Sequence, residues 1–276
     1  MNRAIAAHHG KFGRACIYEQ NRSMVPHAHR EGHLVFHLRG QCATFNVSGN
    51  SIEVVGDTAL AVSPLHIYDV SYNESKESAL LLILYISPKW FVKAAKKPDQ
   101  SLLFGSNTIE INSGIKSMMR LVTKQLIWDD DLHLIEGHLC KLTQACLDQS
   151  WEHSSGIAKS NAGKTSIPDR RIQKSVKLMQ VKPFDEQIIL EVAGEAGLSR
   201  AQFFKLFREH TGVTPNIYLN ILRMDAAIDR LINTTDAITS IGLDLGFATQ
   251  ASFTRFFSAN VGVPPSDYRR VTQLLV

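Results

Sequence analysis

Two sets of side chains near the C-terminal end of the sequence have the types and spacing needed to hydrogen bond to nucleic-acid bases. One set falls within residues 200–208 and the other within residues 249–255. Arginine and lysine donate to guanine, glutamine pairs with adenine, and alanine contacts the thymine methyl group. The candidate DNA contacts are Arg200, Ala201, Phe204, Lys205, Arg208, Thr249, Gln250, Ala251, Ser252 and Arg255. The alternative for such polar residues is a solvated helix face.

The stretches that carry these side chains are two copies of one pattern. Six pairs lie 50 residues apart: Phe203 and Phe253, Lys205 and Arg255, Phe207 and Phe257, Gly212 and Gly262, Pro215 and Pro265, and Tyr218 and Tyr268. Each copy predicts a short apolar helix, a turn at Gly197 or Gly246, and a second helix with a stripe of buried phenylalanines. This order is typical of a helix-turn-helix unit, whose second helix enters the DNA major groove. The duplication favours DNA contact over a solvated face.

The run over residues 242–257, followed by residues 262–269, resembles the signature of the AraC/XylS-type transcription regulators. The resemblance covers about a hundred residues. It implies two helix-turn-helix units joined by a linker helix near residues 216–231, with both reading helices in successive major grooves. Two residues depart from the pattern. Gly242 replaces a usual alanine and is expected to loosen its helix, and Phe204 replaces a polar reader, so the first copy is expected to read shape or a thymine methyl group.

A second group of residues with possible chemistry lies in the N-terminal half. The sequence from Pro26 to His29 contains an HxH pair, and His33 and His66 follow it. This resembles the cupin pattern, with His33 at the usual glutamate position. Four imidazoles can bind Zn, Fe or Ni. Alternatively, they can hydrogen bond to an organic effector, since the resemblance implies an N-terminal domain that usually binds its effector without metal. We expect effector binding with no cofactor, through His27, His29, His33, Arg39, His66 and Tyr68.

The elements expected to position these histidines are short strands. Seven segments are β-prone and separated by turn residues: 12–18, 33–38, 43–47, 51–55, 59–62, 67–70 and 79–86. Regular short strands predict a small sandwich or barrel. Ser87 and Pro88 then predict a helix start. Residues 114–152 change to helical periodicity, which predicts helices that pack on the barrel and form a dimer interface.

Composition limits the class of protein. The chain has 276 residues, 44% of them hydrophobic and 20% charged, with a net charge of +4. DNA affinity must therefore come from local cations and not from bulk charge. The longest apolar run, residues 79–86, is far shorter than the roughly 20 residues of a membrane helix. The N-terminus lacks a secretory core, and the four cysteines show no CxxC spacing. These features predict a cytoplasmic protein with no membrane contact.

Together these features predict an α+β protein of two domains. Residues 1–152 are expected to form a cupin-like β-barrel with packing and dimerisation helices, residues 153–167 a polar linker, and residues 168–276 an all-α DNA-binding domain. The expected function is a transcription regulator, an activator, that binds promoter DNA as a homodimer and contacts RNA polymerase under control of a small-molecule effector. It is not expected to be an enzyme. The alternative is a metal-dependent cupin enzyme fused to a DNA-binding domain.

Overall fold

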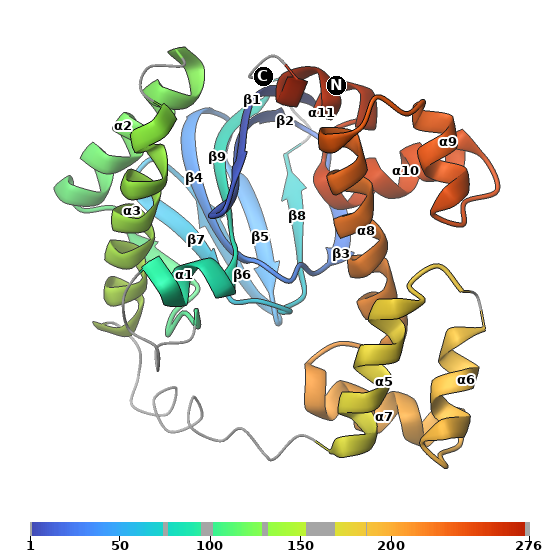
Figure 1. Ribbon diagram of the computed structural model, residues 1–276. Helices are drawn as coiled ribbons and strands as arrows, with labels where there is room; N and C mark the ends of the chain where they lie inside the picture. Colours follow the sequence, from blue (N-terminus) through green and yellow to red (C-terminus); the bar gives the residue numbers. More distant parts are fainter. Residues whose placement is uncertain are drawn as a thin grey trace.

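A computed structural model describes residues 2–73, 77–94, 102–128, 132–152, 169–185 and 187–273. Strands and three helices form a β-rich part, and the helices after residue 169 form a helical part beside it (Figure 1). The predicted linker, residues 153–167, and the predicted helix break at residues 97–99 lie outside the described residues. In the ranges that are described, each helix is too short or too polar to cross a membrane.

The strands form two antiparallel sheets. The larger has the order β1 (Arg3–Gly10), β2 (Gly13–Gln20), β9 (Ala79–Ile86), β4 (Gly32–Gly40), β7 (Thr58–Val62) and β10 (Thr108–Glu110). The smaller has the order β3 (Met24–His27), β8 (Tyr68–Tyr72), β5 (Ala43–Val47) and β6 (Asn50–Val54). Over the described residues the expected barrel is therefore a cupin-like sandwich of two separate sheets, and it is not closed.

All seven predicted strands are present. The described residues also contain three strands that were not predicted, β1, β3 and β10. β1 is rich in alanine and histidine, which have little intrinsic preference for strands. It is held by pairing with β2, in a register that joins Ala7 to Cys16. β3 contains a proline and β10 has only three residues. Pairing with another strand, adjacent in sequence for β1 and distant for β3 and β10, therefore makes these segments strands, and not local composition.

Three helices cover one face of the larger sheet: α1 (Pro88–Ala94), α2 (Ser113–Trp128) and α3 (Leu132–Glu152) (Figure 1). Alternate residues of β9 divide between two cores. Leu82 and Leu84 pack with Ile115 and Leu139 of α2 and α3. The intervening residues, including Tyr85, face the interior between the sheets. This is the packing predicted for helices in residues 114–152.

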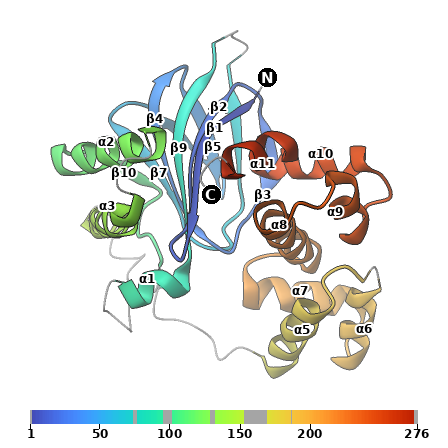
Figure 2. The same ribbon diagram turned by 45° about the horizontal axis from the view of Figure 1, so that its top comes forward.

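The helical part contains α5 (Arg170–Val181), α6 (Ile188–Glu195), α7 (Arg200–Thr211), α8 (Pro215–Asn233), α9 (Ile238–Asp244), α10 (Gln250–Val261) and α11 (Pro265–Gln273). Helices α6 and α7 form the first helix-turn-helix unit, and α9 and α10 form the second. The long helix α8 runs between the two units (Figure 2). The predicted linker helix is thus present and is slightly longer than expected.

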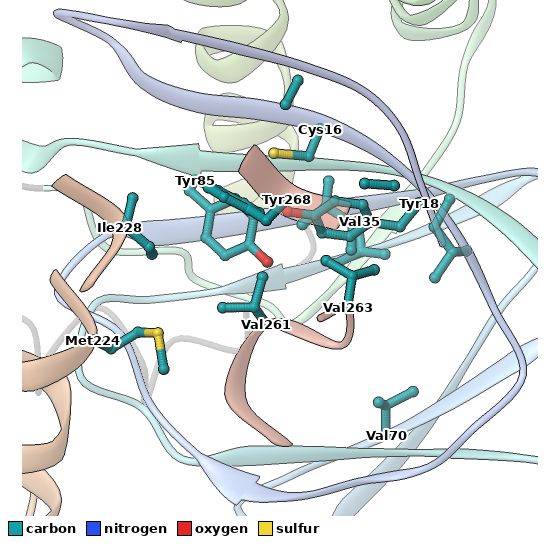
Figure 3. Packing of buried hydrophobic residues seen from close by; sticks show 14 of the residues in the cluster. Cys16, Tyr18, Val35, Val70, Tyr85, Met224, Ile228, Val261, Val263 and Tyr268 are labelled. Carbon is teal, nitrogen blue, oxygen red and sulfur yellow. The ribbon is translucent and has the colours of Figure 1, made fainter. Parts of the chain in front are cut away.

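The second unit and the sandwich share one hydrophobic core. Val261 and Val263, at the end of α10, are buried in the same cluster as Tyr18 and Val35 of the larger sheet (Figure 3). Tyr268 of α11 is fully buried there as well. The sandwich interior is therefore filled on this side by side chains of the helical part.

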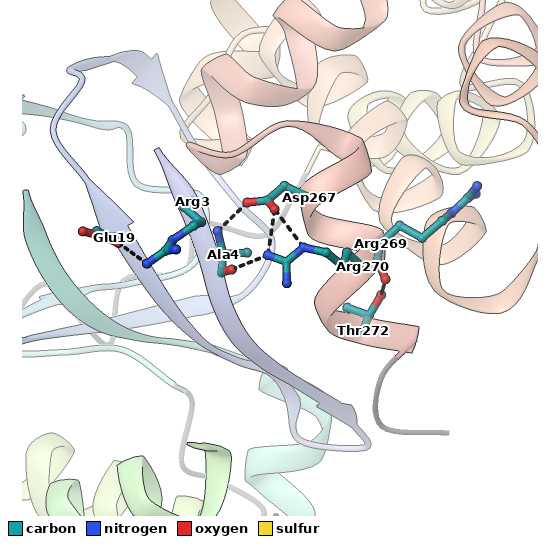
Figure 4. Close-up of polar contacts among 7 residues, drawn as sticks. All are labelled: Arg3, Ala4, Glu19, Asp267, Arg269, Arg270 and Thr272. Atoms are coloured by element: carbon teal, nitrogen blue, oxygen red, sulfur yellow. Dashed lines mark hydrogen bonds and ion pairs between the residues drawn. The ribbon is translucent and has the colours of Figure 1, made fainter. Parts of the chain in front are cut away.

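Polar contacts close the edge of this shared core. The Ala4 N–H of β1 donates to Asp267 Oδ2 at 2.7 Å, and Arg270 Nη2 donates to the Ala4 carbonyl oxygen at 2.9 Å (Figure 4). Arg270 also pairs with Asp267 at 2.8 Å. Strand β1 and helix α11, from opposite ends of the sequence, are thereby joined.

Candidate DNA interface and ligand-binding residues

Helix α7 of the first unit begins and ends at defined caps. The Ser199 side chain accepts from the Gln202 N–H, and Gln202 reciprocates, which forms a capping box. At the other end Gly212 has a φ of 81°, in the left-handed region where glycine is favoured. Phe203 and Phe207 are fully buried between these caps. The opposite face is thereby fixed outward, with Arg200, Ala201, Lys205 and Arg208 exposed and Phe204 half-buried.

Helix α10 of the second unit repeats this arrangement 50 residues later. Thr249 and Ser252 form its capping box, and Gly262 ends it with a φ of 87°. Phe253 and Phe257 are fully buried. The outward face then exposes Thr249, Gln250, Ala251 and Arg255, while Ser252 is half-buried. The predicted contact residues of each unit therefore share one face of one helix.

The turns of the two units differ by one residue. Gly197 and Gly246 both have positive φ, 65° and 86°, and both follow the first helix of the unit. They lie 49 residues apart, whereas the N-caps Ser199 and Thr249 lie 50 apart. The second turn thus contains one additional residue before its reading helix.

The candidate contact residues differ in whether their polar atoms already form hydrogen bonds or ion pairs within the protein. Ser252 Oγ donates to the Thr249 carbonyl oxygen at 2.7 Å, and Gln250 Oε1 accepts from Thr239 Oγ1 at 2.5 Å. In contrast, Lys205, Arg208 and Arg255 make no ion pair or side-chain hydrogen bond with any residue that the structure describes. These three cations are free to meet phosphates or bases.

Gly242, which is expected to loosen its helix, lies at the contact between α9 and α10. Gly242 is buried, and a Cβ atom built there would lie 2.9 Å from Phe253 Cβ. This residue lets α9 approach α10 closely. Glycine has a low helix propensity, but the absence of a Cβ atom at this position allows the two helices of the second unit to pack tightly.

Three of the predicted ligand-binding histidines meet in the sandwich interior. The rings of His29 and His33 stack with centroids 4.6 Å apart, and His27 meets His29 edge-on at 5.1 Å. The Tyr68 hydroxyl and His33 Nδ1 are hydrogen bonded at 2.8 Å. The Nε2 atoms of the three histidines have no hydrogen-bond partner among the described residues. Such buried unpaired nitrogens are where water or a ligand is expected.

Burial sets the charge state of this histidine cluster, defined as His27, His29, His33 and Tyr68. Desolvation lowers the pKa of His27 to about 4, although its Nδ1 donates to the Val25 carbonyl oxygen at 2.7 Å. Desolvation also places the pKa values of His29 and His33 well below 6.5, helped by nearby charges. The cluster is therefore neutral at pH 7.

The other two predicted ligand-binding residues lie apart from this cluster. Arg39 is exposed near the far end of β4, and His66 is exposed on the loop between β7 and β8. Across the described ranges, no three histidine, cysteine or acidic side chains are grouped to hold a metal ion. The four histidines of the cupin-like pattern thus do not converge, because local spacing does not determine where the β7–β8 loop points.

Comparison with known proteins agrees with this geometry. A helix-turn-helix domain family model matches residues 192–271. The TetD protein of transposon Tn10 from Escherichia coli is 35% identical over 124 residues, which cover 43% of this chain and 90% of TetD. The HTH-type transcriptional regulator MtrA of Neisseria gonorrhoeae is 28% identical over 102 residues. The chain belongs to the AraC/XylS-type transcription regulators.

For some of these relatives the match covers only part of either protein. The chain spans 34% of the length of MtrA and 37% of that of an uncharacterised HTH-type regulator of Haemophilus influenzae. The crystal structure of ToxT from Vibrio cholerae matches 99% of this chain and 97% of its own, with a TM-score of 0.58 and 16% identity. The two-domain fold, with its sandwich and two helix-turn-helix units, is therefore shared with ToxT.

Proposed function

We propose that this protein regulates transcription by binding a specific DNA site through α7 and α10 together. One observation carries the proposal: both helices have matched caps 50 residues apart and present unpaired cations on the face opposite their buried phenylalanines. A duplicated surface of this kind fits successive turns of one groove. We propose residues 168–276 as the DNA-binding domain and residues 1–152 as the regulatory domain.

We further propose that a small-molecule effector controls this binding from the sandwich. The unpaired Nε2 atoms of the histidine cluster support this, because a ligand with hydrogen-bonding groups would satisfy them. ToxT, whose fold this chain shares, has been solved with an unsaturated fatty acid bound. For the effector to regulate, it must bind one arrangement of the protein better than another.

The remaining partners belong to the same proposal. Activation through RNA polymerase is supported by the names of two relatives, the activator RclR of Escherichia coli and the lactose operon activator of Staphylococcus xylosus. A homodimer is supported by exposed apolar side chains at the α2–α3 end, where Trp128 is 70% exposed and Leu134 50%. No enzymatic step is part of the proposal, and metal analysis of the purified protein tests the cupin-enzyme alternative.

Replacement of Arg255 by alanine tests the DNA-binding role. A preferred site is first selected from random DNA with the wild-type protein. Arg255→Ala should then lose about 1–3 kcal/mol of preference for that site over random sequence. Arg22→Ala, which removes an exposed cation from the β-rich part, serves as the control and should keep the preference. An unchanged ratio of specific to random affinity for Arg255→Ala in gel-shift titrations would reject this role.

A further inference from the structure

A groove of about 640 Å³ lies between the β-rich part and the C-terminal end of α7. One wall comes from β3, from the end of β5 and the turn that follows it, and from the loop between β7 and β8 together with the start of β8. The other wall comes from the last turn of the first reading helix. The polar residues that line it are Asn46, Ser48, His66, Asp69, Arg208 and Thr211. This groove is distinct from the histidine cluster and shares only Tyr68 with it.

The backbone of the groove is strained at one position. Ser48 and Leu65 are the described non-glycine residues with positive φ, 52° and 63°, and both line the groove. Ser48 is explained by the two-residue hairpin turn it forms with Gly49. No hairpin turn accounts for the positive φ of Leu65. This backbone conformation is unfavourable for a residue with a bulky side chain. The Leu65 N–H donates to the His29 carbonyl oxygen at 2.8 Å, which holds the loop in place. Strain of this kind is concentrated at binding sites.

The groove has a cationic side chain on one wall and a carboxylate on the other. Arg208 is exposed and forms no ion pair with any residue in the described ranges. On the opposite wall, the Asp69 carboxylate accepts from Asn46 Nδ2 at 3.4 Å and retains further acceptor capacity. A guanidinium attracts a carboxylate or phosphate. A carboxylate, in contrast, accepts from hydroxyl groups.

We propose that this groove binds a small hydroxylated anion, a sugar phosphate or sugar carboxylate, with its anionic group at Arg208 and its hydroxyl groups at Asp69 and Asn46. The regulatory consequence rests on the proposed function, in which Arg208 contacts DNA. One guanidinium cannot serve both the ligand and DNA at the same time. The bound ligand therefore weakens DNA binding, and DNA weakens ligand binding by the same factor.

Calorimetric titration of the full chain tests the site without DNA. The probes are glucose 6-phosphate and gluconate, which distinguish the phosphate from the carboxylate class, and glucose is the neutral control. At least one anion should bind, and glucose should not. Arg208→Ala and Asp69→Ala should each weaken binding about tenfold or more. Lys205→Ala, which removes a cation of the same helix that does not line this groove, should bind the anion normally.

Two outcomes would overturn the site. One is that neither anion binds at about 10 mM, and the other is that Lys205→Ala weakens binding as much as Arg208→Ala.

Gel shifts then test the link to DNA with the site selected by the wild-type protein. Saturating anion should lower the DNA affinity of the wild-type protein severalfold and leave that of Arg208→Ala unchanged. Equal inhibition of both proteins, or of neither, would overturn the link. If the protein selects no DNA sequence at all, the proposed function fails, whereas the calorimetric result still decides the groove.

Discussion

At the scale of single residues, Thr249 and Ser252 show how one side chain can be needed for two purposes. Both were predicted to contact DNA, and both now form the capping box of α10. Capping satisfies backbone N–H groups that the helix itself leaves unpaired. Their contact with DNA stays a prediction, while their part in the stability of the helix follows directly from the hydrogen bonds.

Removal of either N-cap should destabilise the protein. Thr249→Ala should lower the free energy of unfolding by about 1 kcal/mol, because the Ser252 N–H loses its acceptor. Ser199→Ala, its counterpart in the first unit, should have an effect of the same size. Urea denaturation of both variants measures this. Unchanged stability in Thr249→Ala would contradict the structural role.

The buried histidines predict that acid destabilises the protein. His27 and His9 have pKa values of about 4 and about 3 in the folded chain, both lowered mainly by desolvation. The unfolded chain binds protons near the ordinary pKa of 6.5. Protons therefore favour unfolding as the pH falls below about 6.5 towards 4. The melting temperature should be clearly lower at about pH 5 than at about pH 7.5.

One carboxyl group opposes this trend and provides a control. Desolvation, and after it the nearby charge of Glu31, raise the pKa of Asp225 to about 7. Between its ordinary value of 3.8 and about 7 the folded state binds more protons at this residue, so acidification stabilises it there. Asp225→Asn should therefore steepen the loss of stability in acid. A flat profile of stability against pH for the wild-type protein would contradict the prediction.

At the scale of elements, two glycines in equivalent helices predict opposite responses to alanine. Gly242→Ala should destabilise the protein by about 1–3 kcal/mol, because the gain in helix preference is smaller than the strain of forcing a Cβ against Phe253. Gly194→Ala in α6 meets no atom within 4 Å. That variant should be stabilised by about 0.5–1 kcal/mol. Thermal melting compares the two, and a stabilised Gly242→Ala would show that α9 can move away.

The helical elements could be predicted from the sequence because their signals are local. N-cap hydroxyls, C-terminal glycines and phenylalanine stripes recur at one offset, and they place α7 and α10 within a residue or two. The outward faces follow from the buried ones. The ligand-binding residues could not be placed in the same way. Arg39 is positioned by the pairing of β4 with the distant β9, and His66 by a loop that connects strands of two different sheets. Strand β1 was missed because its alanines and histidines form no β-prone pattern, although it pairs with β2, its neighbour in sequence.

At the scale of the whole molecule, the two units have different neighbours. In the first, the Tyr218 hydroxyl accepts from Gln180 Nε2 of α5 at 2.8 Å. The equivalent Tyr268 of the second unit is hydrogen bonded to His9 Nε2 of β1 at 3.1 Å. The β-rich part thus supplies to the second unit the partner that a helix supplies to the first. Nothing in the 50-residue repeat indicates this difference.

Loss of the contact between β1 and α11 should weaken the whole protein. Asp267→Ala removes the acceptor of the Ala4 N–H and leaves Arg270 only the Ala4 carbonyl oxygen, so it should lower the free energy of unfolding by about 1–3 kcal/mol. Asp267→Asn keeps one acceptor oxygen and should lose less. Urea denaturation ranks the two variants. Equal stability of both variants and the wild-type protein would show that this contact is solvated and does not hold the parts together.

The core shared by the sandwich and α10–α11 bears on the use of this protein as a source of interchangeable modules. A chimera that transplants residues 169–273 onto a foreign sensor would separate Val261, Val263 and Tyr268 from the strands that cover them. The transplanted segment would carry a newly exposed hydrophobic patch beside one of its two reading helices. Builders of hybrid biosensors from this chain should therefore bring β1 and β2 along with the DNA-reading half, or redesign that patch as a polar surface.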